Sequence, residues 1–115
     1  MKHPRLLLFA AVVASLIAGR AAAQDASVHE VTEIRYHIEG RTREWVLADL
    51  LRENELYVGR QFPSRGELDR AVADRTQILI NERTLETARI DVAVEPRAGA
   101  PAAVRLDVHV RDSWN

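Results

Sequence analysis

The chain has 115 residues, of which 47% are hydrophobic and 29% charged, as in an ordinary globular domain. Its first 23 residues have the layout of a removable leader, which leaves room for one small domain with a modest core. The absence of cysteine excludes disulfide frameworks, zinc–thiolate clusters and thiol catalysis. The formal net charge of −1 and the lack of a basic stripe argue against nucleic acid as a partner.

Residues 1–23 have the three parts of a secretory leader. A positively charged start precedes the apolar run of residues 6–18, and the small residues 21–23 follow. We therefore expect cleavage between Ala23 and Gln24. The apolar run is shorter than the roughly 20 residues that a membrane span needs, so a retained membrane anchor is the less favoured alternative. The leader predicts export, and a location in the periplasm if the source cell has two membranes.

The first half of the remaining chain reads as a strand followed by a helix. Residues 24–30 are polar and form a loose lead-in. Residues 31–39 alternate apolar and polar side chains, which predicts a strand that ends at Gly40. Thr42 is the expected N-cap of a helix that runs to about residue 53. Residues 54–63 contain Gly and Pro and are expected to form a connector.

The second half reads as a helix followed by two strands. The Ser64-x-x-Glu67 capping box predicts a helix that runs to about residue 80. Residues 87–95 and 104–111 alternate like strands and are joined by a six-residue turn, so an antiparallel hairpin is expected. The order β-α-α-β-β predicts an α+β two-layer sandwich, in which two antiparallel helices cover one face of a three-stranded mixed sheet.

This order resembles the POTRA (polypeptide-transport-associated) domain over residues 31–112. Residues 38–44 (IEGRTRE) are similar to the first turn of that family, in which a glycine ends the first strand and an Arg-Thr-x-Glu step opens the first helix. Residues 56–62 resemble its inter-helix segment, where a glycine precedes a buried Phe. Residues 104–111 stand where the last strand of the family would lie.

The resemblance implies a non-enzymatic module without a cofactor, placed in the periplasm and N-terminal to an outer-membrane β-barrel. Its partners would be unfolded or extended outer-membrane or secreted polypeptides and neighbouring assembly subunits. Such clients add a strand to the edge of the sheet, and the matching edge is the strand 87–95, provided that the last strand lies in the middle. The expected partner-binding residues are Arg89, Ile90, Asp91, Val92, Ala93 and Val94.

Three further groups of side chains are relevant to possible sites. The least polar stretch of the connector predicts a docking loop, whose members are Leu56, Tyr57, Val58 and Phe62. Trp45 and Tyr57 are expected to seal the core more than to contact a partner. Metal ligation by His37, Glu39, Asp107 and His109 is conceivable on the polar sheet face, but a solvated charged surface is the favoured interpretation.

Two alternatives stay open at this point. If the leading hypothesis fails, the first alternative is a stand-alone small periplasmic binding or inhibitor protein. The second is a membrane-anchored divisome-type POTRA protein. Residues 113–115 are expected to begin a missing continuation, including a C-terminal β-barrel, or to form a short tail.

Overall fold

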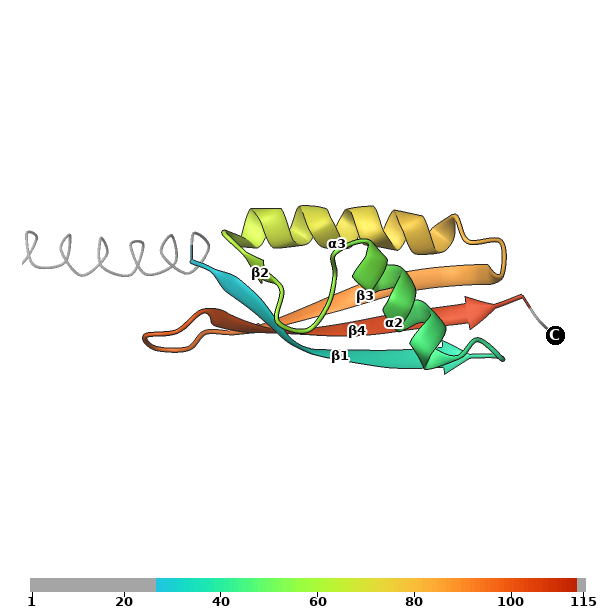
Figure 1. Ribbon diagram of the computed structural model, residues 1–115, viewed down its shortest axis with the longest axis horizontal. Coiled ribbons are helices and arrows are strands. Elements are labelled where there is room, and N and C mark those ends of the chain that lie inside the picture. Colours follow the sequence, from blue (N-terminus) through green and yellow to red (C-terminus); the bar gives the residue numbers. More distant parts are fainter. Residues whose placement is uncertain (1–26, 114–115) are drawn as a thin grey trace, which may run out of the picture.

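The computed structural model describes residues 27–113 (Figure 1). The predicted cleavage pair Ala23 and Gln24 lies outside these described residues. The elements in chain order are β1 (His29–Glu39), α2 (Glu44–Glu53), β2 (Gln61–Phe62), α3 (Arg65–Ile80), β3 (Leu85–Glu95) and β4 (Ala102–Asp112).

The strands form one mixed sheet in the order β2-β1-β4-β3. β4 lies in the interior of the sheet, parallel to β1 and antiparallel to β3. The prediction of three strands was wrong, because part of the expected connector forms β2, which pairs antiparallel with His29 and Glu30. Two residues are too few to show an alternating pattern. The same pairing draws His29 and Glu30, expected in the lead-in, into β1.

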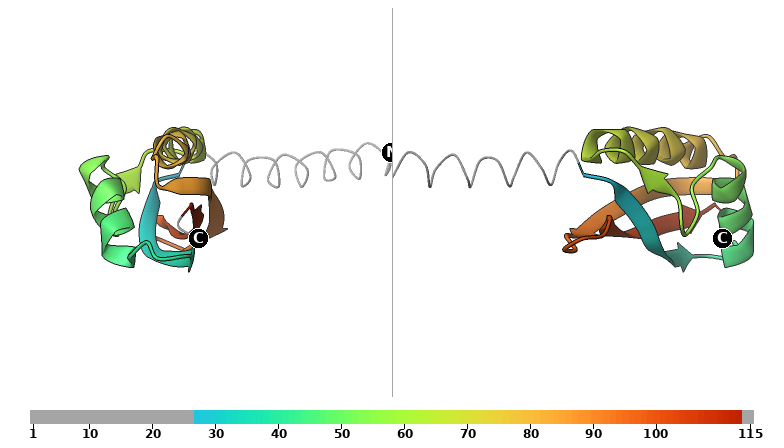
Figure 2. Two further views of the ribbon diagram at one scale, coloured as in Figure 1. Left: turned by 90° about the vertical axis from the view of Figure 1, so that its right-hand side faces the viewer. Right: turned by 60° about the vertical axis from the view of Figure 1, so that its left-hand side comes forward.

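Both helices cover the same face of the sheet, but they are not antiparallel neighbours. α3 lies along β3 and follows the long axis of the molecule, whereas α2 runs steeply across that direction, beside β1 (Figures 1 and 2). The connector between them returns to the sheet as β2 before α3 begins, so no tight turn folds one helix back on the other. The helices meet where Arg75 Nε donates to the carbonyl of Asn54 at 2.8 Å.

The core lies between the helices and the sheet. β4 contributes every second residue to it, as expected for a strand with one polar face. Thr32 is an extra residue in the β1–β4 ladder, between Val31 and Glu33, and its hydroxyl donates to the carbonyl of Val104 at 3.2 Å. This bulge allows Val31 and Ile34 to face the core together. The buried core residues are Val31, Leu47, Leu51, Leu56, Phe62, Leu68, Ala71, Val72, Leu79, Leu85, Val104, Leu106, Val108 and Val110.

The two helices begin differently. The backbone N–H of Glu67 donates to Ser64 Oγ at 3.2 Å, which confirms the predicted N-cap of α3. The N-cap of α2 is Arg43, which makes no side-chain capping bond. The prediction of Thr42 as N-cap was therefore wrong, because the Thr42 hydroxyl is used elsewhere.

Asp112 fastens the turn between β1 and α2 to the end of β4. Its side chain is buried, and Oδ2 accepts from the N–H of Arg41 at 2.6 Å, the N–H of Thr42 at 2.7 Å and the Thr42 hydroxyl at 2.9 Å. Gly40 is needed here because its φ is +130° and because a Cβ would overlap the Asp112 carboxylate. The turn and the last strand are thus built to fit each other.

Candidate functional site

β3 forms one long outer edge of the sheet. It pairs with β4 from Leu85 to Glu95, and no segment of residues 27–113 pairs with its other side. Alternate residues of such a strand turn their N–H and C=O groups outward, where they are available to another strand. The six predicted partner-binding residues, 89–94, occupy the middle of this edge.

The side chains of this edge alternate between two surroundings. Ile90, Val92 and Val94 are partly buried and pack against the core on the helix side. Arg89 and Asp91 lie on the opposite side of the sheet, where the Arg89 Nε–Asp91 Oδ2 distance is 3.3 Å. Charged side chains such as these discourage self-association of an edge while leaving its backbone groups unpaired.

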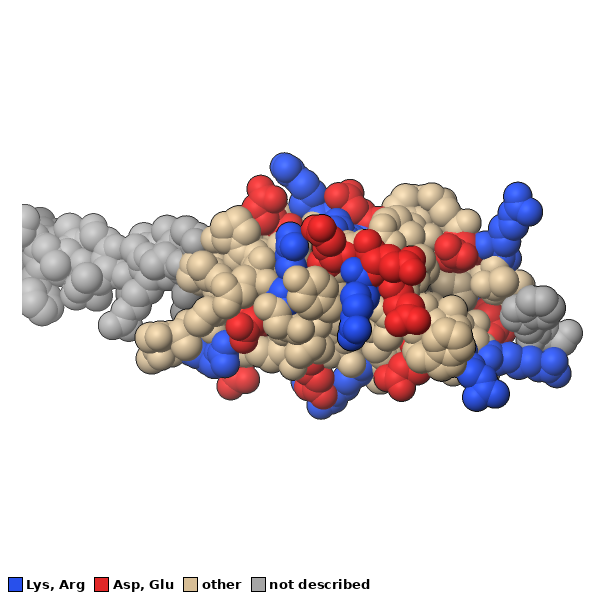
Figure 3. Space-filling view, in the orientation of Figure 1, with Lys and Arg blue, Asp and Glu red and all other residues tan. Residues whose placement is uncertain are grey.

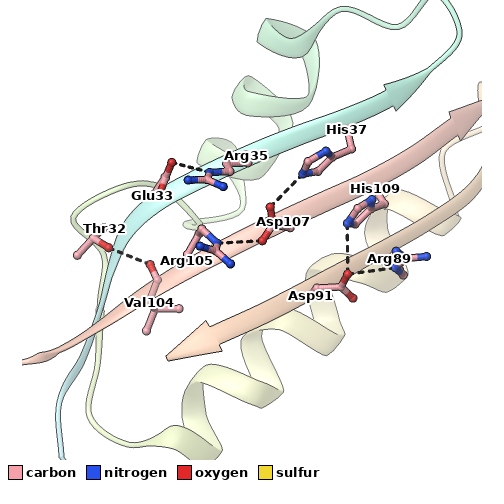
Figure 4. Close-up of polar contacts among 10 residues, drawn as sticks. All are labelled: Thr32, Glu33, Arg35, His37, Arg89, Asp91, Val104, Arg105, Asp107 and His109. Atoms are coloured by element: carbon pink, nitrogen blue, oxygen red, sulfur yellow. Dashed lines mark hydrogen bonds and ion pairs between the residues drawn. The ribbon is translucent and has the colours of Figure 1, made fainter. Parts of the chain in front are cut away.

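The sheet surface opposite the helices, hereafter the open face, carries two copies of an Arg–Asp–His arrangement (Figure 4). In one, Asp107 accepts from Arg105 Nε at 3.1 Å and lies 2.9 Å from His37 Nε2. In the other, Asp91 lies 3.3 Å from Arg89 Nε and 3.2 Å from His109 Nε2. The two imidazole rings stack with centroids 4.4 Å apart.

These contacts set the electrostatics of the open face. The hydrogen bond from His37 is the main reason that the pKa of Asp107 lies below its usual range; burial acts in the opposite sense, and Arg105 lowers the value further. Within the described part of the chain, no group of three or more His, Asp or Glu side chains is arranged to hold a metal ion. The open face therefore neutralises its own charges.

The predicted docking loop divides between core and surface. Leu56 and Phe62 are buried and belong to the core, whereas Tyr57 and Val58 expose 39% and 59% of their surface. Trp45 exposes 63% of its surface on α2, so the expectation that Trp45 and Tyr57 seal the core was wrong for both residues. The leucines at 47 and 51 face the sheet instead, and Trp45 falls on the other side of the helix.

The surface in Figure 3 carries interspersed acidic and basic side chains and no large basic patch. Among residues 27–113, no helix is long and apolar enough to cross a bilayer. Comparison with known protein families, with curated proteins and with solved structures gave no match to this chain.

Proposed function

We propose that this chain is a non-enzymatic module that binds extended polypeptide segments along the outer edge of β3. The observation that carries the proposal is that β3, eleven residues long, is paired on one side only among the described residues. A strand added there would extend the sheet through main-chain hydrogen bonds, each contributing about 0.5–1.5 kcal/mol net. Because these bonds involve the backbone, many client sequences would be accepted.

The side chains beside this edge define a preference for the client. On the helix side, a bound strand would lie next to Ile90 and Val92, so apolar residues at alternate positions would extend the core. On the open face it would lie next to Arg89 and Asp91, which favour polar or charged residues. The preferred client is therefore an alternating segment, as strands of β-rich proteins are.

The wider setting belongs to the same proposal. The leader-like layout of residues 1–23 supports export and a periplasmic location. The order of elements supports a role in outer-membrane protein assembly or secretion, with neighbouring subunits and a following β-barrel as partners. Sequencing the N-terminus of the mature protein tests the first part, because Gln24 as the first residue requires a cleaved leader.

The binding mode can be tested with a pair of proline variants. Successive N–H groups point to opposite sides of a strand, so one of Val92 and Ala93 donates toward β4 and the other points outward. Val92→Pro and Ala93→Pro should therefore differ: one breaks the β3–β4 ladder, and the other stays folded but loses an edge donor. Fluorescence anisotropy with alternating peptides should show weaker binding to the folded variant. Unchanged affinity in that variant would overturn the proposal.

A further inference from the structure

β1 is a second open edge of the sheet, because residues 27–113 cover its outer side only near its start. β2 pairs with His29 and Glu30, the N–H of Val31 donates to the carbonyl of Arg60 at 2.9 Å, and the N–H of Gly59 donates to the carbonyl of Val31 at 2.7 Å. Beyond that point, no described segment pairs with the outer side of residues 33–39. The edge thus continues past the place where the chain itself covers it.

A groove lies beside this open stretch, between β1, α2 and the segment that follows α2. Its volume is about 470 Å³. Residues of β1 and α2 line it together with the exposed side chains of Tyr57 and Val58. Side chains of a strand added to β1 would lie next to those of Ile34 and Tyr36, on the groove side of the sheet. The lining residues are Ile34, Tyr36, Ala48, Arg52, Leu56, Tyr57 and Val58.

Arg52 is the one charged residue among the side chains that line the groove. No described carboxylate forms an ion pair with Arg52, whereas the nearby Arg60 is paired with Glu55 at 3.3 Å. Burial raises the pKa of the Tyr36 hydroxyl, the negative charge of Glu44 raises it further, and the positive charge of Arg52 lowers it. A largely apolar groove whose one charged lining residue is Arg52 complements a ligand with apolar side chains and a carboxylate.

We propose that this groove, which we name the β1–α2 groove, binds an extended segment of another polypeptide antiparallel to β1. Apolar side chains of the segment pack against Ile34 and Tyr36, and an Asp or Glu side chain of the segment pairs with Arg52. The antiparallel direction follows from continuity, since residues 59–62 already lie antiparallel on the same edge. The class of ligand rests on the proposed function, but the site and the carboxylate requirement are separate from β3.

The test uses the full chain and a C-terminally amidated peptide of about ten residues that alternates Val and Thr and carries one central Glu. Arg52→Gln should weaken its binding about two- to fivefold, the usual size of an exposed ion pair. Arg70→Gln is the matched control, an exposed arginine on α3, and should leave the affinity unchanged. Replacing Glu by Gln in the peptide should weaken binding to the wild type equally, with no further loss in Arg52→Gln. Equal affinity of the Glu and Gln peptides for the wild type would overturn the carboxylate pairing.

Backbone pairing and location are tested by NMR with two N-methylated forms of the peptide. Methylation of the alternate N–H groups that face β1 should abolish the amide shift changes at residues 33–39 and 56–58, and methylation of the other set should preserve them. Shift changes confined to residues 87–95 would overturn the β1–α2 groove and leave the proposed function standing. Changes confined to residues 33–39 and 56–58 would support the groove and refute the β3 edge.

Discussion

The two faces of β4 each carry an aspartate, and the two side chains have different roles. Asp112 points toward the helices, is only 1% exposed and fastens the turn at residues 40–42. Asp107, five residues earlier, points to the open face and shares its charge with His37 and Arg105. A strand turns successive residues to opposite sides, so an even or odd position decides whether a carboxylate is a structural clamp or part of a solvated surface.

The largest loss of stability is expected when a buried side chain on the helix side of β4 is truncated. Leu106 is fully buried, so Leu106→Ala should lower the free energy of unfolding by about 2–5 kcal/mol. Arg105→Ala, its neighbour on the open face, should change stability by no more than about 0.5 kcal/mol. Urea unfolding measures both values. Equal losses at the two positions would contradict the assignment of the faces.

The next largest loss of stability is expected at the close contact between Gly40 and the Asp112 side chain. Asp112→Ala should cost about 1–3 kcal/mol, because buried N–H donors lose their acceptor. Gly40→Ala should cost more in the wild type than in the Asp112→Ala background, since the overlap with the carboxylate disappears there. Backbone strain of about 1–3 kcal/mol from the positive φ remains in both backgrounds. An identical cost in the two backgrounds would show that close approach does not matter.

The smallest effect concerns Asp107 and depends on pH. Its pKa in the folded chain is depressed, chiefly by the His37 hydrogen bond, so the ionised carboxylate stabilises the fold at pH values above the ordinary Asp value of 3.8. That contribution is lost as the pH falls through the depressed folded value. The stability of Asp107→Asn should therefore fall below that of the wild type near neutral pH and converge with it in acid.

Chemical unfolding at several pH values measures this convergence. Glu86→Gln, at an exposed residue of β3, is the control, because it removes a negative charge that has no contact with His37. A stability gap between wild type and Asp107→Asn that stays constant into strong acid would contradict the role of the His37 hydrogen bond.

Periodicity was sufficient to predict the three long strands and both helices, because each has one apolar side. It could not predict β2, which is too short to have a period, or the angle of α2, which depends on the path of the connector. Two further positions in the sequence indicate features that periodicity alone does not predict. Val31 and Ile34 are both apolar although three residues apart, which requires a bulge in the strand between them. Asp112 continues the even-numbered apolar series of β4, which indicates that its side chain is buried.

Of the two candidate binding sites, one could be predicted from the sequence and the other could not. An exposed edge at β3 could be expected from strand order alone, because the last strand had only to lie in the middle. The β1–α2 groove could not be predicted, since it needs both the tilt of α2 and the exposed positions of Tyr57 and Val58. Arg52 looks like any other surface arginine in the sequence. Only its place in the lining of the groove distinguishes it.

The interior position of β4 affects how the chain can fold while it is being synthesised. β1 and β3 each pair with β4 and not with one another, and the clamp at Asp112 joins residues 70 positions apart. A nascent chain that has reached only residue 100 holds two long strands with no shared neighbour, so its sheet cannot yet close. Such distant pairings make folding slow, and the sheet can close only after β4 has been synthesised. The nascent chain would therefore remain unfolded until β4 has been synthesised.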